Sequence, residues 1–189
     1  PGQVESDASI IYGSNTIKNN LSLLQAVREA NPTDYIIYKI HPDIQAGLRS
    51  NGGNENNILQ FCNEVVFNVN IEQLFPLVDE VHVLTSLAGF EALLRNKTVV
   101  CYGHPFYSGW GLTKDVYTSN RLHSRTLLLN ELIAGTLILY PIYVSKVTGK
   151  FTTPERALEE LITWSKTEKK LALTELLYQL AVKYFKACL

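Results

Sequence analysis

Hydrophobic positions in the first 113 residues fall into short apolar runs separated by segments with helical spacing. Apolar runs rich in β-branched and aromatic residues predict buried strands, and they lie at residues 8–12, 35–40, 65–67, 80–84 and 98–102. Between them, steps of three and four residues predict helices, such as the one that carries Ile17, Leu21, Leu24 and Val27. This alternation of strands and helices predicts an α/β fold with a mainly parallel sheet flanked by helices.

The pattern changes after residue 113. A helix is predicted from Asn130 to Leu139, and the capping box at residues 152–155 starts a pair of amphipathic helices that continues to the end of the chain. We therefore expect an α/β domain over residues 1–150 and a helical extension of it over residues 151–189.

Composition narrows the class of protein. The chain has 189 residues and a net charge of −1, which disfavours a nucleic-acid partner. Its three cysteines have no Cys-x-x-Cys spacing, which argues against a zinc site and favours a reducing compartment. No apolar run reaches the length of a membrane span. Because the chain begins at Pro1 and contains no methionine, we expect it to be a fragment or a processed form.

One candidate anion site follows the second predicted strand. Lys39 and His41 alternate onto the same side of the chain, and Pro42 comes directly after them. Two potential cations at a strand end suit a phosphate or a carboxylate. A histidine that only packs against a turn is the structural alternative.

Residues 85–91 (Thr-Ser-Leu-Ala-Gly-Phe-Glu) follow the fourth predicted strand and begin a helix. The hydroxyls of Thr85 and Ser86 and the amides up to Gly89 would form an anion site at the helix N-terminus. Glu91 could accept hydrogen bonds from a ribose diol, or it could belong to an ordinary capping box.

The fifth predicted strand continues into a loop rich in glycine and aromatic residues, at the edge where open α/β sheets bind ligands. Tyr107 and Trp110 suggest stacking on a base or a sugar, while the alternative is a loop held together by its own aromatic rings. Asp7 taken alone would be an ordinary surface carboxylate. The other histidines, His82, His104 and His123, show no spacing typical of a metal site, so we expect no metal.

Five stretches in order resemble the capsule polysaccharide biosynthesis family of KpsC and KpsS, bacterial Kdo transferases. The resemblance covers most of residues 1–145, and the loop after the fifth predicted strand is most similar to KpsC. The matching stretches are residues 1–10 (Pro-Gly-Gln-Val-Glu-Ser-Asp-Ala-Ser-Ile), 38–43 (Tyr-Lys-Ile-His-Pro-Asp), 85–93, 102–113 (Tyr-Gly-His-Pro-Phe-Tyr-Ser-Gly-Trp-Gly-Leu-Thr) and 132–143.

The resemblance implies the Rossmann-like C-terminal (donor) domain of a GT-B glycosyltransferase, followed by C-terminal helices. The implied donor is CMP-β-Kdo, transferred with retention to a β-Kdo oligosaccharide on a glycolipid, with no cofactor. Implied partners are the glycolipid at the inner membrane face and the missing N-terminal GT-B half, so the fragment alone would be inactive. The implied location is cytoplasmic, peripheral to the inner membrane.

The resemblance also implies roles for individual residues. His41 would contact the CMP phosphate, and Lys39 would neutralise the phosphate or the Kdo carboxylate. Ser86 and the backbone after it would hold the same phosphate, while Glu91 would bind the ribose. The carboxylate of Asp7 would be the nucleophile of a double displacement.

Two other functions fit the sequence. The chain could be a non-catalytic domain that binds a nucleotide or a partner protein, with its terminal helices as the docking surface. It could also be another sugar-nucleotide enzyme of the same fold, either sialyltransferase-like or epimerase-like.

Overall fold

A computed structural model describes residues 1–41, 43, 55–118 and 125–167. The chain divides into two compact units, Pro1–Leu132 and Ile133–Leu189. This division lies earlier than the boundary expected at residue 150, because the hairpin after residue 142 packs with the helix that follows it. Each unit is described by itself.

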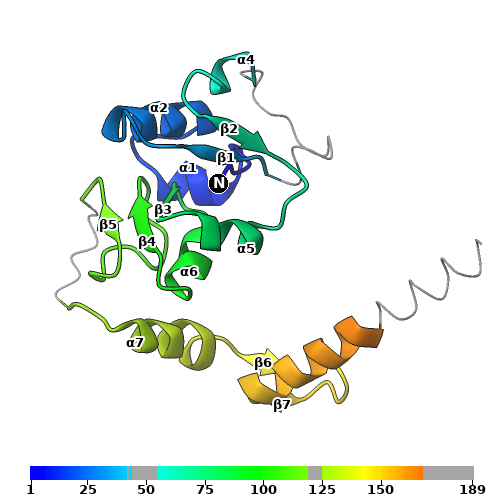
Figure 1. The fold of residues 1–189 in the computed structure, drawn as a ribbon. Helices are drawn as coiled ribbons and strands as arrows, with labels where there is room; N and C mark the ends of the chain where they lie inside the picture. The colour runs from blue at the N-terminus through cyan, green and yellow to red at the C-terminus, as the bar shows by residue number, and fades with distance from the viewer. Residues whose placement is uncertain (42, 44–54, 119–124, 168–189) are drawn as a thin grey trace, which may run out of the picture. The chain divides into compact units, whose positions relative to one another are not determined.

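The first unit contains two groups of parallel strands (Figure 1). In one group, β1 (Ile37–Lys39) pairs with β2 (Glu64–Val66). In the other, β3 (Glu80–Val83) pairs with β4 (Thr98–Cys101), and β4 pairs with β5 (Lys114–Asp115). The expected parallel strands with flanking helices are confirmed.

The longest helix of the first unit is α2 (Asn20–Ala30), which lies alongside the β1–β2 pair (Figure 1). The side chain of Asn19 accepts a hydrogen bond from the amide of Ser22 at 2.8 Å and so caps its start. The buried face of α2 joins both strand groups in one hydrophobic core. That core includes Leu23, Leu24, Val27, Tyr38, Leu84, Val100 and Tyr102.

The strand expected at residues 8–12 is wrong, because these residues form the helix α1 (Ala8–Gly13). Asp7 takes the N-cap position, and the Asp7 carbonyl accepts hydrogen bonds from the amides of Ile10 and Ile11 at 3.0 Å. Ile10 is fully buried whereas Tyr12 is 85% exposed. The β-branched pair Ile10 and Ile11 favoured a strand by composition, whereas both amides bond back to the Asp7 carbonyl in a helical turn.

Among the described residues, further short helical segments lie between the strands. They are α4 (Glu55–Ile58), which leads into β2, α5 (Ile71–Leu74), which continues into the 3-10 turn η1 (Phe75–Leu77), and α6 (Leu87–Leu93), which connects β3 to β4. The ring of Phe75 is 1% exposed and anchors η1 in the core.

The second unit follows α7 (Leu129–Ile133), which continues into the π-helical segment η2 (Ala134–Leu139). The strands β6 (Tyr143–Val144) and β7 (Phe151–Thr152) form an antiparallel hairpin, and residues 154–167 form a helix. The second terminal helix expected from the sequence lies outside the described residues. Within the described ranges, no helix has the length and apolar character needed to cross a bilayer.

Two contacts hold the hairpin to the helix at residues 154–167. The hydroxyl of Ser145 donates to Glu160 at 2.8 Å, and the ammonium of Lys146 lies 3.5 Å from the ring centroid of Trp164. These contacts explain why residues 143–152 belong to the second unit rather than the first.

Helix α6 approaches the loop after β4 so closely that only glycine fits at position 89. A Cβ atom there would lie 2.2 Å from the hydroxyl oxygen of Tyr107, whose side chain is fully buried. Tyr107 donates this hydroxyl to the carbonyl of Ser86. Gly89 therefore allows the contact that attaches the loop to the start of α6.

We expect Gly89→Ala to lower the free energy of unfolding by about 2 kcal/mol, because the methyl group would displace Tyr107 from a packed site. Urea denaturation of the purified chain measures the loss. Gly135→Ala is the control, since a Cβ at Gly135 would meet no atom within 4 Å. Equal stability of the two variants would contradict this view of the contact.

Candidate functional site

The N-terminal segment connects the carboxyl ends of β1 and β3. The amide of Gly2 donates to the carbonyl of Lys39 at 2.7 Å. The side chain of Gln3 then donates from Nε2 to the Thr85 hydroxyl at 3.1 Å, and its Oε1 accepts from the Thr85 amide at 3.0 Å. The turns after β1 and β3, which carry His41 and Ser86, are thus tied through two consecutive residues.

One buried and one half-buried side chain hold this segment in place. Asn20, at the start of α2, accepts from the Gln3 amide and donates to the Gln3 carbonyl, both at 2.9 Å. Glu5 accepts from the amide of Asn20 at 2.8 Å. Asn20 is 4% exposed and Gln3 is 9% exposed. Because buried polar groups are costly when unpaired, this network specifies one position for the segment.

The end of β4 is brought to the same place by close backbone contact. A Cβ at Gly103 would lie within 3.0 Å of the Leu84 and Gly13 carbonyl oxygens, and the next amide, that of His104, donates to Gly13 at 2.6 Å. The carboxyl ends of β3 and β4 therefore meet the end of α1. This edge of the strands is where open α/β sheets bind their ligands.

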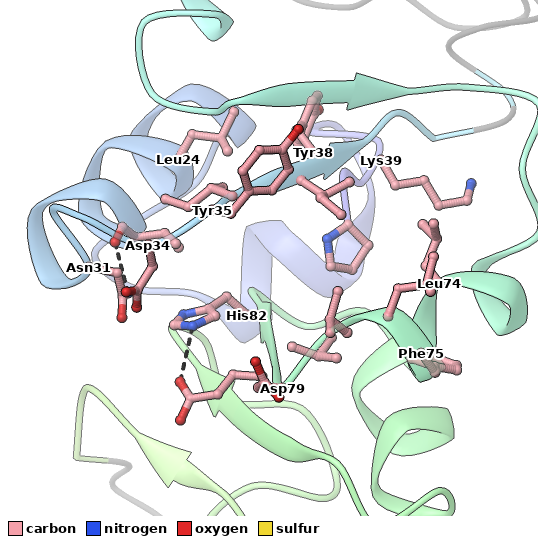
Figure 2. Close-up of a pocket in the computed structure, with 18 of the residues that line it drawn as sticks. Leu24, Asn31, Asp34, Tyr35, Tyr38, Lys39, Leu74, Phe75, Asp79 and His82 are labelled. Atoms are coloured by element: carbon pink, nitrogen blue, oxygen red, sulfur yellow. Dashed lines mark hydrogen bonds and ion pairs between the residues drawn. The ribbon is translucent and has the colours of Figure 1, made fainter.

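Lys39 and His41 lie at the end of β1. The ammonium of Lys39 donates to the Ile40 carbonyl at 3.3 Å, and partial burial lowers the pKa of Lys39. Figure 2 shows its side chain at the end of a cavity, away from Asn31 and Asp34. Nδ1 of His41 accepts from the amide of Asp43 at 3.2 Å. The ring is therefore left with Nε2 as a hydrogen-bond donor. Pro42 lies outside the described residues.

Ser86 caps α6, with its hydroxyl oxygen 3.2 Å from the amide of Ala88. The neighbouring Thr85 has both its hydroxyl and its amide engaged by Gln3, so in this structure it supports the turn rather than offering these groups to a ligand. Of the two hydroxyl residues in the expected anion site, Ser86 is therefore the one that is not bound to Gln3.

Glu91 does not complete a capping box. Ser86 is the N-cap, so the glutamate of a capping box would stand at position 89, which is a glycine. Glu91 is half-buried one turn further on, and its carbonyl accepts from Arg95 at 2.9 Å. Among the described residues its carboxylate has no hydrogen-bond partner. It therefore has the capacity to accept hydrogen bonds from a ligand.

The aromatic loop is held largely by its own contacts. Tyr107 is fully buried and presents no ring face to solvent, so stacking on a base does not fit it in this structure. The indole of Trp110 is half-buried and donates to the Phe106 carbonyl at 2.9 Å. Asp115 accepts from the Gly109 amide and the Thr113 hydroxyl, both at 2.7 Å. Trp110 is the member of the predicted pair that retains a partly exposed ring.

Asp7 stands between the N-terminal segment and α1. Its amide donates to the Val4 carbonyl at 3.0 Å, and its side chain, which is half-buried, does not cap the helix. The carboxylate is thus not used for the local interaction that its N-cap position usually provides. In the described part of the chain, no group of three or more His, Cys, Asp or Glu side chains could hold a metal ion.

Comparison with known proteins identifies the family. Residues 1–151 match the family described as capsule polysaccharide biosynthesis protein. The chain belongs to this family.

Curated relatives of this capsule family include two different proteins. The capsule polysaccharide modification protein LipA of Neisseria meningitidis serogroup A is 47% identical over 169 residues, which cover 89% of this chain and 24% of LipA. The lipopolysaccharide-processing protein LpsZ of Rhizobium meliloti is 39% identical over 85% of this chain and 36% of LpsZ. The chain spans about a quarter to a third of the length of these relatives.

Two solved structures also resemble the chain. The Thermosulfurimonas dismutans KpsC β-Kdo 2,7 transferase matches with a TM-score of 0.79 and 50% identity, over 87% of this chain and 52% of that one. The KpsC β-Kdo 2,4 transferase of the same organism matches with a TM-score of 0.72 and 30% identity, over 85% of this chain and 50% of that one. The chain therefore has the Rossmann-like α/β fold of a GT-B domain, as in these two KpsC structures.

The candidate site of this capsule-family chain therefore lies at the carboxyl ends of the strands. Two residues that support it, Gln3 and Asn20, were not identified from the sequence. Gln3 and Asn20 hold the turns that carry His41 and Ser86 in place. Asn20 follows Lys18 and Asn19, so nothing in its local sequence indicates that it is buried. The pairing of Gln3 with Thr85 spans 82 positions of sequence and leaves no local signal.

We expect Thr85→Val to lower the free energy of unfolding by about 1–2 kcal/mol, because it removes the hydroxyl that pairs with the buried Gln3 amide. Chemical denaturation measures the effect. Thr98→Val makes the same chemical change at an exposed position of β4, where we expect a change within about 0.5 kcal/mol. A Thr85→Val variant as stable as Thr98→Val would show that the pair contributes nothing.

Proposed function

We propose that this chain is the donor-binding half of a retaining β-Kdo glycosyltransferase whose donor substrate is CMP-β-Kdo. The observation that carries the proposal is the likeness to the KpsC β-Kdo 2,7 transferase, at 50% identity over 87% of this chain. The family match over residues 1–151 also includes His41, Ser86 and Glu91. The rest of the enzyme would come from the N-terminal GT-B half.

CMP leaves a sugar readily when the charge on its phosphate is neutralised. The Nε2–H of His41 would donate to a phosphate oxygen, and Lys39 would add a positive charge to the same phosphate or to the Kdo carboxylate. Ser86 and the first amides of α6 would hold the phosphate from the other turn. Such fixed donors stabilise the leaving group without a metal or another cofactor.

Glu91 would bind the ribose. Its carboxylate, which has no hydrogen-bond partner among the described residues, can accept from both hydroxyls of a ribose diol. Trp110 would contribute its partly exposed ring, whereas Gly89, Thr85 and Tyr107 would support the turn from within.

Retention is explained by two displacements at the anomeric carbon. The Asp7 carboxylate would form a bond to that carbon while its bond to the phosphate oxygen breaks, and CMP would leave with the electron pair. The acceptor hydroxyl would then attack the same carbon, its proton would pass to a base, and the carboxylate would leave. Two inversions restore the original configuration.

The nearer of the two KpsC likenesses supports a proposal for the linkage. Identity is 50% to the β-Kdo 2,7 transferase and 30% to the β-Kdo 2,4 transferase. We therefore assign 2,7 transfer to this module, onto a β-Kdo oligosaccharide carried by a phosphatidylglycerol-type glycolipid. An acceptor of that kind would place the enzyme at the cytoplasmic face of the inner membrane.

A non-catalytic nucleotide-binding domain is the second candidate function. It is favoured by the self-contained hydrogen bonding of Thr85 and Tyr107, which stabilises the turn without a ligand. This candidate differs from the first only in turnover by the longer enzyme. A sialyltransferase-like enzyme would differ in the sugar that it takes from CMP.

Titration calorimetry with CMP tests the phosphate contact. We expect His41→Ala to weaken CMP binding at least about tenfold, or about 1.4 kcal/mol, because a hydrogen bond to a charged oxygen is lost. The same variant should bind cytidine, which lacks the phosphate, as the unchanged chain does. Equal losses for both ligands, or none for CMP, would remove His41 from the phosphate site.

We expect Glu91→Gln to weaken CMP binding about fivefold to tenfold, because a neutral amide accepts less strongly from the ribose hydroxyls. Glu72→Gln is the matched control, since Glu72 pairs with Arg95 at the surface, 2.8 Å away. Calorimetry on both variants makes the comparison. Indistinguishable affinities would exclude Glu91 from ribose binding.

In a longer enzyme that contains both GT-B halves, Asp7→Asn should reduce transfer from CMP-β-Kdo by at least about a thousandfold, since the nucleophile is lost. Asp34→Asn, a change at an exposed turn, should leave the rate unchanged. Mass spectrometry of the unchanged enzyme, incubated with donor alone, should detect one added Kdo. Peptide mapping should locate that Kdo on a peptide containing Asp7. Full turnover by Asp7→Asn would contradict the double displacement.

A further inference from the structure

A cavity of about 420 Å³ separates the two strand groups of the first unit. Residues 35–39, which include β1, form one wall, and residues 79–82, which include most of β3, form the opposite wall. Figure 2 shows Tyr35, Tyr38 and Lys39 across the cavity from Asp79 and His82. The cavity therefore lies in the plane of the strands, between the edges of β1 and β3.

In the described part of the chain, β1 has β2 as its strand neighbour and β3 has β4, so that the strands form separate sheets. The edge of a parallel strand offers amides and carbonyls to a further strand. Both edges that border the cavity belong to strands whose carboxyl ends meet at Gly2 and Gln3. A strand placed between them could pair with both edges in the same direction.

Apolar side chains cover the cavity on both of its open faces. Leu24 and Val27 of α2 lie on one face, while Ile71, Leu74 and Phe75 of α5 and η1 lie on the other. Figure 2 shows Leu24 and the pair Leu74 and Phe75 on different sides of the cavity. A parallel strand with helices on both faces is apolar throughout, rather than alternating between apolar and polar residues.

The position of Pro1 in the cavity indicates the direction in which such a strand would run. Pro1 lines the cavity, and the next amide, that of Gly2, already donates to the Lys39 carbonyl at 2.7 Å. Burial, with a smaller effect of Lys39, lowers the pKa of the Pro1 amine to about 6.

We propose that this cavity receives a β-strand of about five apolar residues that runs parallel to β1 and β3, pairs with both, and leads directly into Pro1. The strand would join the two groups into one sheet in the order β2, β1, inserted strand, β3, β4, β5. A longer form of this chain would supply the strand, and the KpsC transferase that it resembles is about twice as long. The inserted strand would set the spacing between the turns of His41 and Ser86.

Three matched chains test the proposal, each with five residues added before Pro1. One addition is Val-Ile-Val-Ile-Val, the second is Gly-Ser-Gly-Ser-Gly, and the third is Val-Ile-Pro-Ile-Val, which keeps the apolar character but loses the central amide. Hydrogen–deuterium exchange followed by mass spectrometry measures the amides of residues 36–39 and 80–83. Light scattering establishes the oligomeric state of each chain.

We expect amide exchange in β1 and β3 to be at least about tenfold slower with Val-Ile-Val-Ile-Val than with either other addition, in a chain that stays monomeric. Exchange in the β6–β7 hairpin should be equal in all three. Equal exchange in β1 and β3, or protection that appears only as a dimer forms, would overturn the proposal. Both readouts are independent of nucleotide, so a failure here is distinct from a failure to bind CMP.

Discussion

The candidate site depends on the two hydrogen bonds that join the side-chain amide of Gln3 to Thr85. They join the start of the chain to the end of β3, while Gly2 joins it to the end of β1. Each bond is worth little by itself, but a buried amide without partners is costly. Asn20 and Glu5 complete the network, so that the N-terminal segment has one well-defined position. The turns that carry His41 and Ser86 derive their spacing from that position.

The same constraint separates supporting groups from groups available to a ligand. Thr85, Gly89 and Tyr107 use their hydrogen-bonding or packing capacity inside the protein. His41 keeps a donor at Nε2, and the Glu91 carboxylate has no hydrogen-bond partner among the described residues. A phosphate accepts hydrogen bonds, whereas the hydroxyls of a ribose can donate them. His41 offers a donor for the former and Glu91 an acceptor for the latter. The chemistry proposed for a CMP-sugar therefore rests on groups that the fold does not itself use.

Much of the fold could be predicted from the sequence because it is encoded locally. Apolar runs located β1 to β4, and the spacing of Leu24 and Val27 located α2. The failures have physical causes. Residues 8–12 resemble a strand in composition, yet the amides of Ile10 and Ile11 bond to the Asp7 carbonyl in a helical turn. The two-residue strand β5 is too short to leave a periodic signal. The sequence placed Tyr107 in an aromatic loop, but only the packing against Gly89 shows that its ring points inward.

The proposed function requires one phosphoryl group to bind between the turns after β1 and β3. A crystal structure of the chain soaked with CMP would locate that group. We expect the CMP phosphate within hydrogen-bond distance of Nε2 of His41 and of Ser86, with the ribose at Glu91. A well-ordered CMP whose phosphate lies elsewhere, with neither residue in contact, would contradict it.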